Sequence, residues 1–373
     1  MASVGRRSDG SSGYQVRYRD PDGRQRAKAF RRKGDADRFA AVVEADKARG
    51  AYVDPTAGRI KLRDYAEQWL AAQTFDEATR IATELRIRLH VNPHLGDRPL
   101  AGIRPSEIQS WLRLLQQRLA PRYVRVIHAN LSALFNAAID DDRIAKNPCS
   151  AASVRLPAVD DGRVQPWSVE QVKAVKTALP ARYRILVSLA AGCGLRQGEL
   201  FGLAEDDIDL KQGVVHVRRQ VKILGPHLVF ASPKGRKTRD VPLPESVALE
   251  VTAYLQDYPA RIATLPWQAT DGTPREYPLL VTSRESKPLN RNYVNRLIWK
   301  PALTAAGVAP TRENGMHALR HFYASVLLDA GESIRALASY LGHSDPGFTL
   351  RVYTHLMPAS EERTKRAIDR ALG

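Results

Sequence analysis

The sequence predicts a multidomain chain with a small β-sheet plus helix first, an all-α domain second, and a mainly α (α+β) domain last. Three observations predict this fold class. The chain has 373 residues, more than one domain usually contains. Its hydrophobic residues change from alternating to helical spacing along the chain. Linkers with Pro, Gly and Asp near residues 55 and 160 separate the parts, which places the domains at 1–55, 60–157 and 165–373.

The composition excludes several classes of protein. Hydrophobic residues make up 43% of the chain, which is enough for real cores and excludes general disorder. The two cysteines, Cys149 and Cys193, cannot build a disulfide framework or a Cys-based zinc site. The longest apolar stretch, 185–195, is too short to span a bilayer, and the N-terminus lacks the apolar segment of a secretory signal. We therefore expect a soluble, reduced, cytoplasmic protein with no membrane partner.

Positive charge is the strongest signal in the composition. The chain contains 57 Lys and Arg against 40 Asp and Glu, a formal net charge of +17. Residues 1–33 alone hold ten cations and three acids. Such an excess is typical of proteins that bind nucleic acid, and a role in solubility is the alternative.

The first fifty residues have the pattern of a hairpin followed by a helix. Residues 14–19 alternate with the strand period, 20–23 (DPDG) is a strong turn signal, and 25–30 is a returning strand. Residues 35–49 have helical spacing and end at a glycine. Cations on strands can enter a major groove, so we favour DNA contact over a solvated hairpin. The candidate DNA contacts are Arg17, Arg19, Arg24, Arg26 and Lys28.

The second part is predicted to be all helical. Ser106, after Pro105, is the expected N-cap of its third helix. Aromatic and Leu residues at helical spacing indicate core rather than a ligand site. The predicted helices are 62–73, 77–90, 106–119 and 122–140. The residues of the last helix that we expect to face inward are Val126, Leu131, Leu134, Phe135 and Ala138.

The third part mixes helices with short strands. Ser168 is the expected cap of its first helix. Residues 214–220 alternate as a strand, and 221–231 are expected to return beside them. The other helices are predicted at 246–258, at 290–305, and at 317–342, where Gly331 divides two helices.

Residues that could carry chemistry are concentrated in this third part. Arg196 and Glu199 are three residues apart, as are His317 and Arg320, so each pair shares one face of a helix. Two arginines, a lysine and two histidines can surround a phosphodiester and neutralise a transition state with extra negative charge. A tyrosine beside such cations is a reasonable nucleophile, because we expect its phenol to become more acidic. No Walker loop or metal-ligand cluster is present, so we expect no cofactor.

Each of these features alone has an ordinary structural explanation. An Arg with a Glu at i+3 is usually a surface ion pair, LGH is usually a helix C-cap, and a tyrosine near a C-terminus is usually packing. Their joint occurrence in a fixed order favours function. The residues for which we keep helix packing or DNA-backbone contact are His321, Tyr323 and Tyr340. His355 is left without a role.

Four stretches in this order, GCGLRQGEL, SPKGRKTRDVPL, HALRHFYAS and LGHSDPGFTLRVYTH, resemble the tyrosine recombinase family, the phage-type integrases in particular. The resemblance is specific in the catalytic half, from about 165 to 360. It implies an arm-type DNA-binding domain at 1–55, a helical core-binding domain at 60–157 and a tyrosine recombinase catalytic domain at 165–373.

The resemblance also implies roles for individual residues. Arg196 and Arg320 match the pair that clamps the scissile phosphate. His343 matches the position that hydrogen-bonds the phosphate, and Glu199 matches the acidic residue that supports the site without touching substrate.

The remaining roles concern bond breaking and proton transfer. Tyr353 matches the nucleophile that forms a 3′-phosphotyrosine. His317 matches the box II histidine, a proton-transfer partner for the tyrosine hydroxyl. Lys234 matches the β-hairpin lysine that protonates the leaving 5′-oxygen. The family usually has Lys-Thr or Lys-Ser there, whereas this chain has Lys-Gly, so Lys237 is the alternative.

The function implied is site-specific integration, with excision, of a mobile element: a phage, an integrative plasmid or a conjugative element. The enzyme would cut and rejoin double-stranded attachment sites through a Holliday junction, as a homotetramer on DNA and without metal or ATP. A host bending factor or an excision directionality factor would be further partners. The alternatives are a type IB topoisomerase, against which the basic N-terminal domain argues, and a non-catalytic accessory protein, against which the complete set of matching positions argues.

Overall fold

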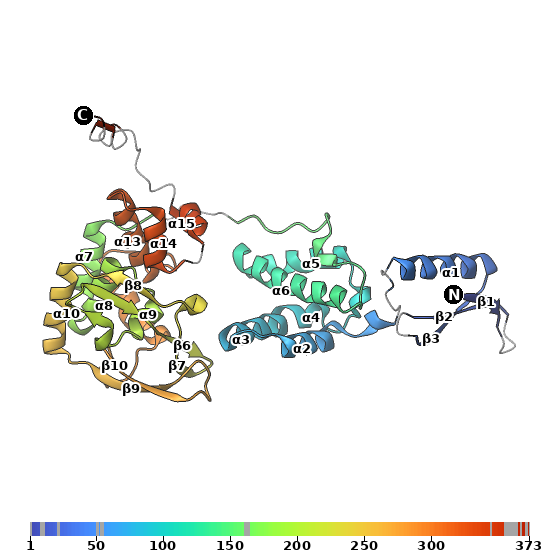
Figure 1. Cartoon of the computed structure of the whole chain (residues 1–373), viewed down its shortest axis with the longest axis horizontal. Helices are drawn as coiled ribbons and strands as arrows, with labels where there is room; N and C mark the ends of the chain where they lie inside the picture. The colour runs from blue at the N-terminus through green and yellow to red at the C-terminus, as the bar shows by residue number, and fades with distance from the viewer. Residues whose placement is uncertain are drawn as a thin grey trace. The chain divides into compact units, whose positions relative to one another are not determined.

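The computed structural model describes residues 2–7, 12–20, 23–49, 52, 56–159, 165–343, 345–353, 365, 368–369 and 372 (Figure 1). The chain forms two compact units, Met1–Asp160 and Asp161–Gly373. Among the described residues, two hydrophobic clusters lie in the first unit and one in the second. The boundaries of the three predicted domains stay a prediction.

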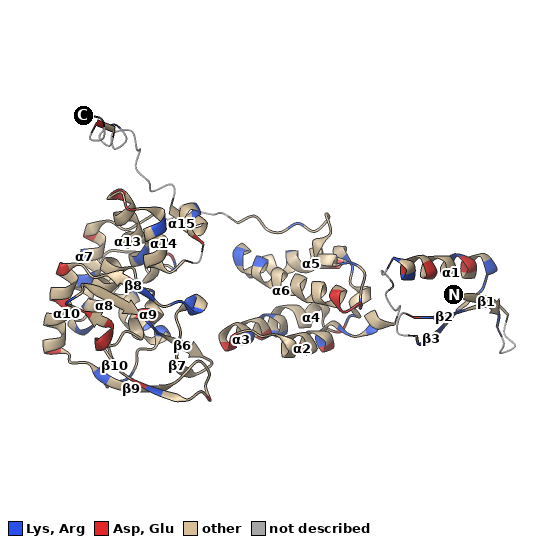
Figure 2. Cartoon of the chain, viewed as in Figure 1, with Lys and Arg blue, Asp and Glu red and all other residues tan. Residues whose placement is uncertain are grey.

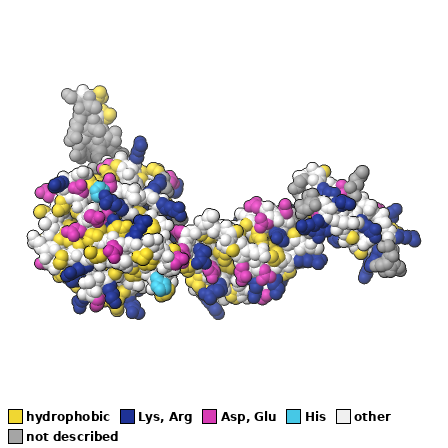
Figure 3. Space-filling model, turned by 60° about the horizontal axis from the view of Figure 1, so that its bottom comes forward, with side chains coloured by type: hydrophobic (Ala, Val, Ile, Leu, Met, Phe, Trp, Pro, Cys, Tyr) yellow, Lys and Arg dark blue, Asp and Glu magenta, His cyan; other side chains and the backbone are white. Residues whose placement is uncertain are grey.

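The N-terminal segment is a three-stranded antiparallel sheet covered by one helix. The strands run in the order β1 (Ser3–Arg6), β2 (Tyr14–Arg19) and β3 (Gln25–Phe30), and helix α1 spans Lys33–Ala48. The two predicted strands are confirmed, and β1 is an addition. Val16 and Tyr18 alternate inward from β2 and pack with residues of α1, because successive strand residues point to opposite faces. Figure 2 marks the Lys and Arg positions along the ribbon of this segment, and Figure 3 shows Lys and Arg side chains on its surface.

The helical part of the first unit has its own core. Its helices are α2 (Leu62–Ala72), α3 (Glu77–Arg86), a π-helical turn (Ile87–Val91), α4 (Asn92–Leu95), α5 (Pro105–Gln116) and α6 (Pro121–Asp140). Short 3-10 helices lie at Ala57–Arg59, Leu100–Gly102 and Pro148–Ser150.

Two predictions about these helices are wrong. Ser106 is not an N-cap: Pro105 is already the first residue of α5, a position that suits its fixed φ, and Arg104 precedes it. Val126 is 39% exposed. Val124 and Ile127 take the inward positions instead, since they continue the helical spacing of Leu131.

The second unit arranges helices around small sheets. Ser168 caps α7, as predicted, because its side chain accepts a hydrogen bond from the Gln171 amide at 3.2 Å. The buried helix α8 packs against α7, α10 and α13. The helices are α7 (Val169–Ala178), α8 (Ala181–Cys193), α9 (Gln197–Phe201), α10 (Glu245–Asp257), α11 (Arg291–Val294), α12 (Lys300–Ala305), α13 (His317–Asp329), α14 (Ile334–Leu341) and α15 (Pro346–Tyr353), with a π-helical turn at Asn295–Trp299 and short 3-10 helices at Glu205–Asp207 and Lys234–Arg236.

The strands of this unit pair differently from the prediction. The segment predicted as one strand at 214–220 is divided between two sheets. A hairpin forms within the predicted return, between β6 (Gln220–Leu224) and β7 (His227–Ala231). Strand β5 (Val214–Val217) lies instead between β4 (Ile208–Asp209) and β8 (Arg239–Pro242). Strands β9 (Arg261–Pro266) and β10 (Pro274–Leu279) form another antiparallel pair.

Among the described residues, no helix has the length and apolar character needed to cross a bilayer.

Candidate active site

The site begins where α8 ends. Gly194 has a φ of 63° and terminates α8 in the left-handed conformation that glycine adopts readily. Two residues later Arg196 precedes α9. The buried Glu199 carboxylate accepts hydrogen bonds from the Arg196 backbone amide at 2.9 Å and from its Nη1 at 3.0 Å. The prediction that Arg196 and Glu199 share one side of a helix start is confirmed.

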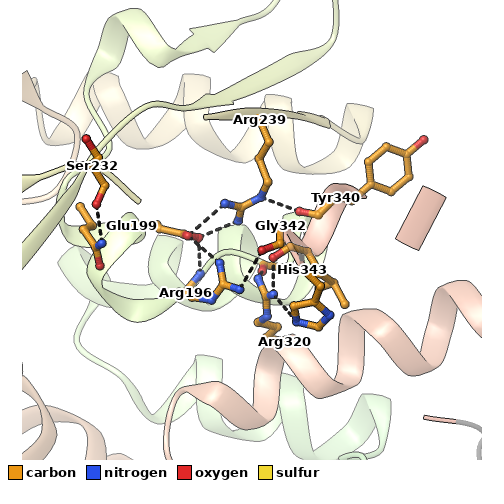
Figure 4. Close-up of polar contacts among 11 residues, drawn as sticks. Arg196, Glu199, Ser232, Arg239, Arg320, Tyr340, Gly342 and His343 are labelled. Carbon is orange, nitrogen blue, oxygen red and sulfur yellow. Dashed lines mark hydrogen bonds and ion pairs between the residues drawn. The ribbon is translucent and has the colours of Figure 1, made fainter. Parts of the chain in front are cut away.

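A second arginine, Arg239 on β8, completes this cluster (Figure 4). Its Nη1 lies 3.0 Å from Glu199 Oε1, its Nη2 lies 2.7 Å from Glu199 Oε2, and its Nε donates to the Tyr340 carbonyl at 2.6 Å. Burial favours a higher pKa for Glu199, but hydrogen bonding and charge from Arg239, then Arg196, outweigh it and hold the pKa at about 2. Sequence reasoning missed Arg239, although it ends the basic turn after β7.

Arg320 lies in the interior, on the first turn of α13. The residue is 1% exposed. Its Nη1 donates to the Gly194 carbonyl at 2.7 Å, and its Nη2 contacts the Leu341 carbonyl and lies 3.1 Å from His343 Nε2. Burial and the charge of Arg196 lower its pKa to about 9. In the described part of the chain no carboxylate forms an ion pair with Arg320. Backbone carbonyls accept hydrogen bonds from its guanidinium instead.

His343 links α13 to α15. Its Nε2 accepts from Arg320, so in the neutral ring Nδ1 carries the proton and donates to Thr349 Oγ1 at 2.7 Å. Burial, followed by the charges of Arg320, Arg196, Arg239 and Lys234, lowers the His343 pKa to about 4. The imidazole is therefore neutral near pH 7.

Tyr353, the last residue of α15, is 2% exposed. Its hydroxyl lies 2.7 Å from His321 Nδ1. Burial raises the Tyr353 pKa to about 12, even though Arg320 and Arg196 act in the opposite direction. The expectation of a more acidic phenol is therefore wrong for this structure, because desolvation outweighs the cations.

The two histidines of α13 occupy different environments. His317 is exposed, and among the described residues no hydrogen bond joins it to Tyr353. Its ring lies 4.7 Å from that of His321, centroid to centroid. Sequence reasoning assigned His321 to helix packing or DNA-backbone contact. Its position four residues after His317 was the signal that could have placed it near the site.

The short 3-10 helix Lys234–Arg236 connects β7 to β8. The prediction of a basic turn between two strands is therefore confirmed. Lys234 and Lys237 are both exposed. Lys234 is among the cations whose charge lowers the His343 pKa. His355, the remaining residue of interest, lies outside the described residues.

The five candidate DNA contacts divide between faces of the N-terminal sheet. Arg17 and Arg19 are exposed on β2, on the face opposite Val16 and Tyr18. Register pairs Arg26 with Tyr18 and Lys28 with Val16, so these two lie on the face toward α1. Arg26 forms an ion pair with the buried Asp20 at 3.0 Å, and the Lys28 ammonium lies 4.4 Å from the Phe39 ring centroid. Arg24, just before β3, is exposed.

In the described part of the chain, no group of three or more His, Cys, Asp or Glu side chains is placed to hold a metal ion.

Comparison with known proteins shows which family this chain resembles. Residues 168–360 match the Phage integrase family, and residues 62–154 match the Phage integrase central domain. The tyrosine recombinase XerD of Xanthomonas axonopodis pv. citri is 30% identical over 301 residues, covering 78% of this chain and 90% of the relative. The putative prophage phiRv2 integrase of Mycobacterium tuberculosis H37Rv is 27% identical over 355 residues, covering 92% and 89%.

Solved structures share the fold. The Tn1549 transposon integrase, in complex with a circular intermediate DNA, superposes with a TM-score of 0.70 at 21% identity, covering 83% of this chain and 99% of that one. A lambda integrase tetramer bound to a Holliday junction gives 0.60 at 20% identity, covering 94% of each chain. The predicted fold class is confirmed.

The chain belongs to the phage integrase family of tyrosine recombinases. It is a site-specific recombinase, an enzyme that breaks and rejoins DNA strands, and the topoisomerase and accessory-protein alternatives are not favoured.

Proposed function

We propose that this recombinase integrates and excises a mobile element by cutting attachment-site DNA with Tyr353 and rejoining it through a Holliday junction. One observation carries the proposal. Arg320 has a buried guanidinium without a carboxylate partner among the described residues, and its positive charge acts on the Tyr353 phenol. A buried cation is stabilised when an anion binds, so this site suits a phosphodiester.

The phosphate would be held from two sides. Arg196 is half-buried, and Glu199 holds it through one hydrogen bond from the guanidinium and one from the backbone amide. Arg196 and Arg320 together can donate to the non-bridging oxygens of a scissile phosphate. Donors already in place cost little reorganisation as charge develops in the transition state.

The chemistry of cleavage needs two proton transfers. Tyr353 Oη loses its proton to a base and forms a bond to phosphorus as the bond from phosphorus to the 5′-oxygen breaks, which leaves a 3′-phosphotyrosine. Lys234 protonates the leaving 5′-oxygen as general acid. Its charge already acts on His343, a residue that contacts Arg320, which supports Lys234 over Lys237.

DNA and three further copies of this chain are the partners that we propose. The lambda integrase tetramer bound to a Holliday junction supports a homotetramer on DNA. Arg17 and Arg19, on the face of β2 opposite its core residues, are the proposed arm-site contacts. We also propose that the recombinase acts on DNA in the cytoplasm of a bacterial host. A bending or directionality factor stays a prediction.

The test is covalent trapping on a nicked suicide substrate, in EDTA and without ATP, since the proposed chemistry uses only protein side chains. The wild-type protein should form a covalent complex, and Tyr353→Phe should bind the DNA equally but form none. Tyr340→Phe is the matched control, because Tyr340 accepts the Arg239 hydrogen bond with its backbone carbonyl, which the substitution keeps. Trapping of Tyr353→Phe would overturn the proposal.

A further inference from the structure

His321 and Tyr353 come from different helices and meet at the reacting atom. His321 lies on the first turns of α13, directly after Arg320, and Tyr353 ends α15. The distance from Nδ1 to the phenolic oxygen is 2.7 Å, and the ring centroids are 5.6 Å apart. This contact is within the reach that proton transfer requires.

The protonation states define the direction of this hydrogen bond. Burial and the charge of Arg320 lower the His321 pKa to about 4, so the ring is neutral near pH 7. The Tyr353 pKa is raised to about 12 by burial, so the phenol keeps its proton. The hydroxyl therefore donates to Nδ1, and the His321 proton lies on Nε2.

We propose that His321 is the general base that takes the phenolic proton of Tyr353 during strand cleavage. This inference rests on the proposed function of Tyr353 as nucleophile. As the bond from Oη to phosphorus forms, the Oη proton passes to Nδ1 and gives an imidazolium. As the bond from phosphorus to the 5′-oxygen breaks, Lys234 supplies a proton to that oxygen.

Rejoining reverses both transfers. The 5′-hydroxyl attacks phosphorus and returns a proton to Lys234, while the His321 imidazolium returns its proton to the Tyr353 oxygen. Negative charge on the bound phosphodiester would stabilise the imidazolium in the presence of Arg320. His317 is exposed, and in the described part of the chain it makes no hydrogen bond with Tyr353. Its ring contacts the His321 ring, so His321 is the histidine that reaches the phenol directly.

Two substitutions separate proton transfer from positioning. His321→Asn keeps an acceptor oxygen for the phenol but has no basic atom, whereas His321→Ala removes both. We expect both variants to form the covalent complex at least about 100-fold more slowly, which is the usual scale of general base catalysis. A wild-type rate for His321→Asn would overturn the proposal.

The nucleophile itself provides a rescue. In the His321→Asn background, 3,5-difluorotyrosine at position 353 should recover most of the lost rate, because the more acidic phenol ionises without a base. A bridging 5′-phosphorothiolate should not rescue this variant, since the defect is in attack rather than departure. The opposite pattern, rescue by the phosphorothiolate and none by the fluorinated phenol, would overturn the proposal.

Two controls keep the inference distinct from the proposed function. If Tyr353→Phe still forms a covalent complex, the assignment of the nucleophile fails. If Tyr353→Phe is inactive while His321→Asn is normal, only the inference about His321 fails. Should the variants not fold, ¹⁵N-histidine NMR of the unmutated protein gives the tautomer: Nε2–H is expected, and Nδ1–H would overturn the proposal.

Discussion

Glu199 and Arg239 form a buried two-point ion pair that joins α9 to β8. The two N–O distances are 3.0 and 2.7 Å, and the side chains are 1% and 6% exposed. Arg239 also donates to the Tyr340 carbonyl of α14, so one guanidinium connects three elements. Because Glu199 also holds Arg196, this ion pair sets the position of a proposed phosphate ligand.

Removal of Arg239 should therefore destabilise the fold and impair cleavage. Arg239→Ala leaves a buried carboxylate with Arg196 alone, and breaking a buried pair costs about 3–5 kcal/mol. Urea unfolding measures the loss. The matched control is Arg80→Ala, which breaks an ion pair to Glu84 with side chains 48% and 53% exposed; it should cost less than about 1 kcal/mol. Equal losses would contradict a structural role for Arg239.

The Glu199 carboxylate should also make stability depend on acid. Its pKa is about 2 in the folded chain and ordinarily 4.5, so the folded state favours the ionised form. The stabilisation is present above pH 4.5 and is lost as the pH falls toward 2. Urea midpoints of the wild-type protein should fall more steeply in this range than those of Glu199→Gln. Parallel pH profiles would show that Glu199 is not the group responsible.

The two lysines between β7 and β8 should differ in how the leaving group affects the cleavage rate of their alanine variants. Lys234→Ala should cleave slowly when the leaving group is a normal 5′-hydroxyl. It should recover with a bridging 5′-phosphorothiolate, whose thiolate leaves without protonation. Lys237→Ala should be mild on both substrates. The reverse ranking in single-turnover cleavage would assign the general acid to Lys237.

The division of cations across the N-terminal sheet predicts different phenotypes. Arg17→Ala with Arg19→Ala should weaken binding to arm-site DNA and make its salt dependence shallower, since fewer phosphates are neutralised. Arg26→Ala should act mainly on stability, because its partner Asp20 is buried. Filter binding across a salt series and thermal unfolding measure the two effects. If Arg26→Ala changed the salt dependence of DNA binding and the Arg17 and Arg19 substitutions did not, Arg26 would be the DNA contact instead.

Local sequence patterns were sufficient for much of the fold. Alternation predicted β2, and the turn signal at 20–23 predicted the returning strand β3, both with the observed bounds. The cap at Ser168 was also predicted correctly, because such features depend on neighbours in the chain. Arg196 and Glu199 were paired correctly for the same reason, since their spacing on one helix turn brings them together. The pairing of β5 was wrong, because the choice of partner strand depends on contacts distant in sequence.

The sequence by itself determined which chemical groups the catalytic half offers and the order in which they occur along the chain. Only the tertiary structure decided which of them meet. His321 and Tyr353 are 32 residues apart, and Arg239 and Glu199 are 40 apart, so no local period relates them. The acidity of Tyr353 was also decided there. The sequence contains the cations, but in the folded chain α15 packs against α14, the phenol contacts His321 of α13 and is buried, and desolvation exceeds the attraction of those charges.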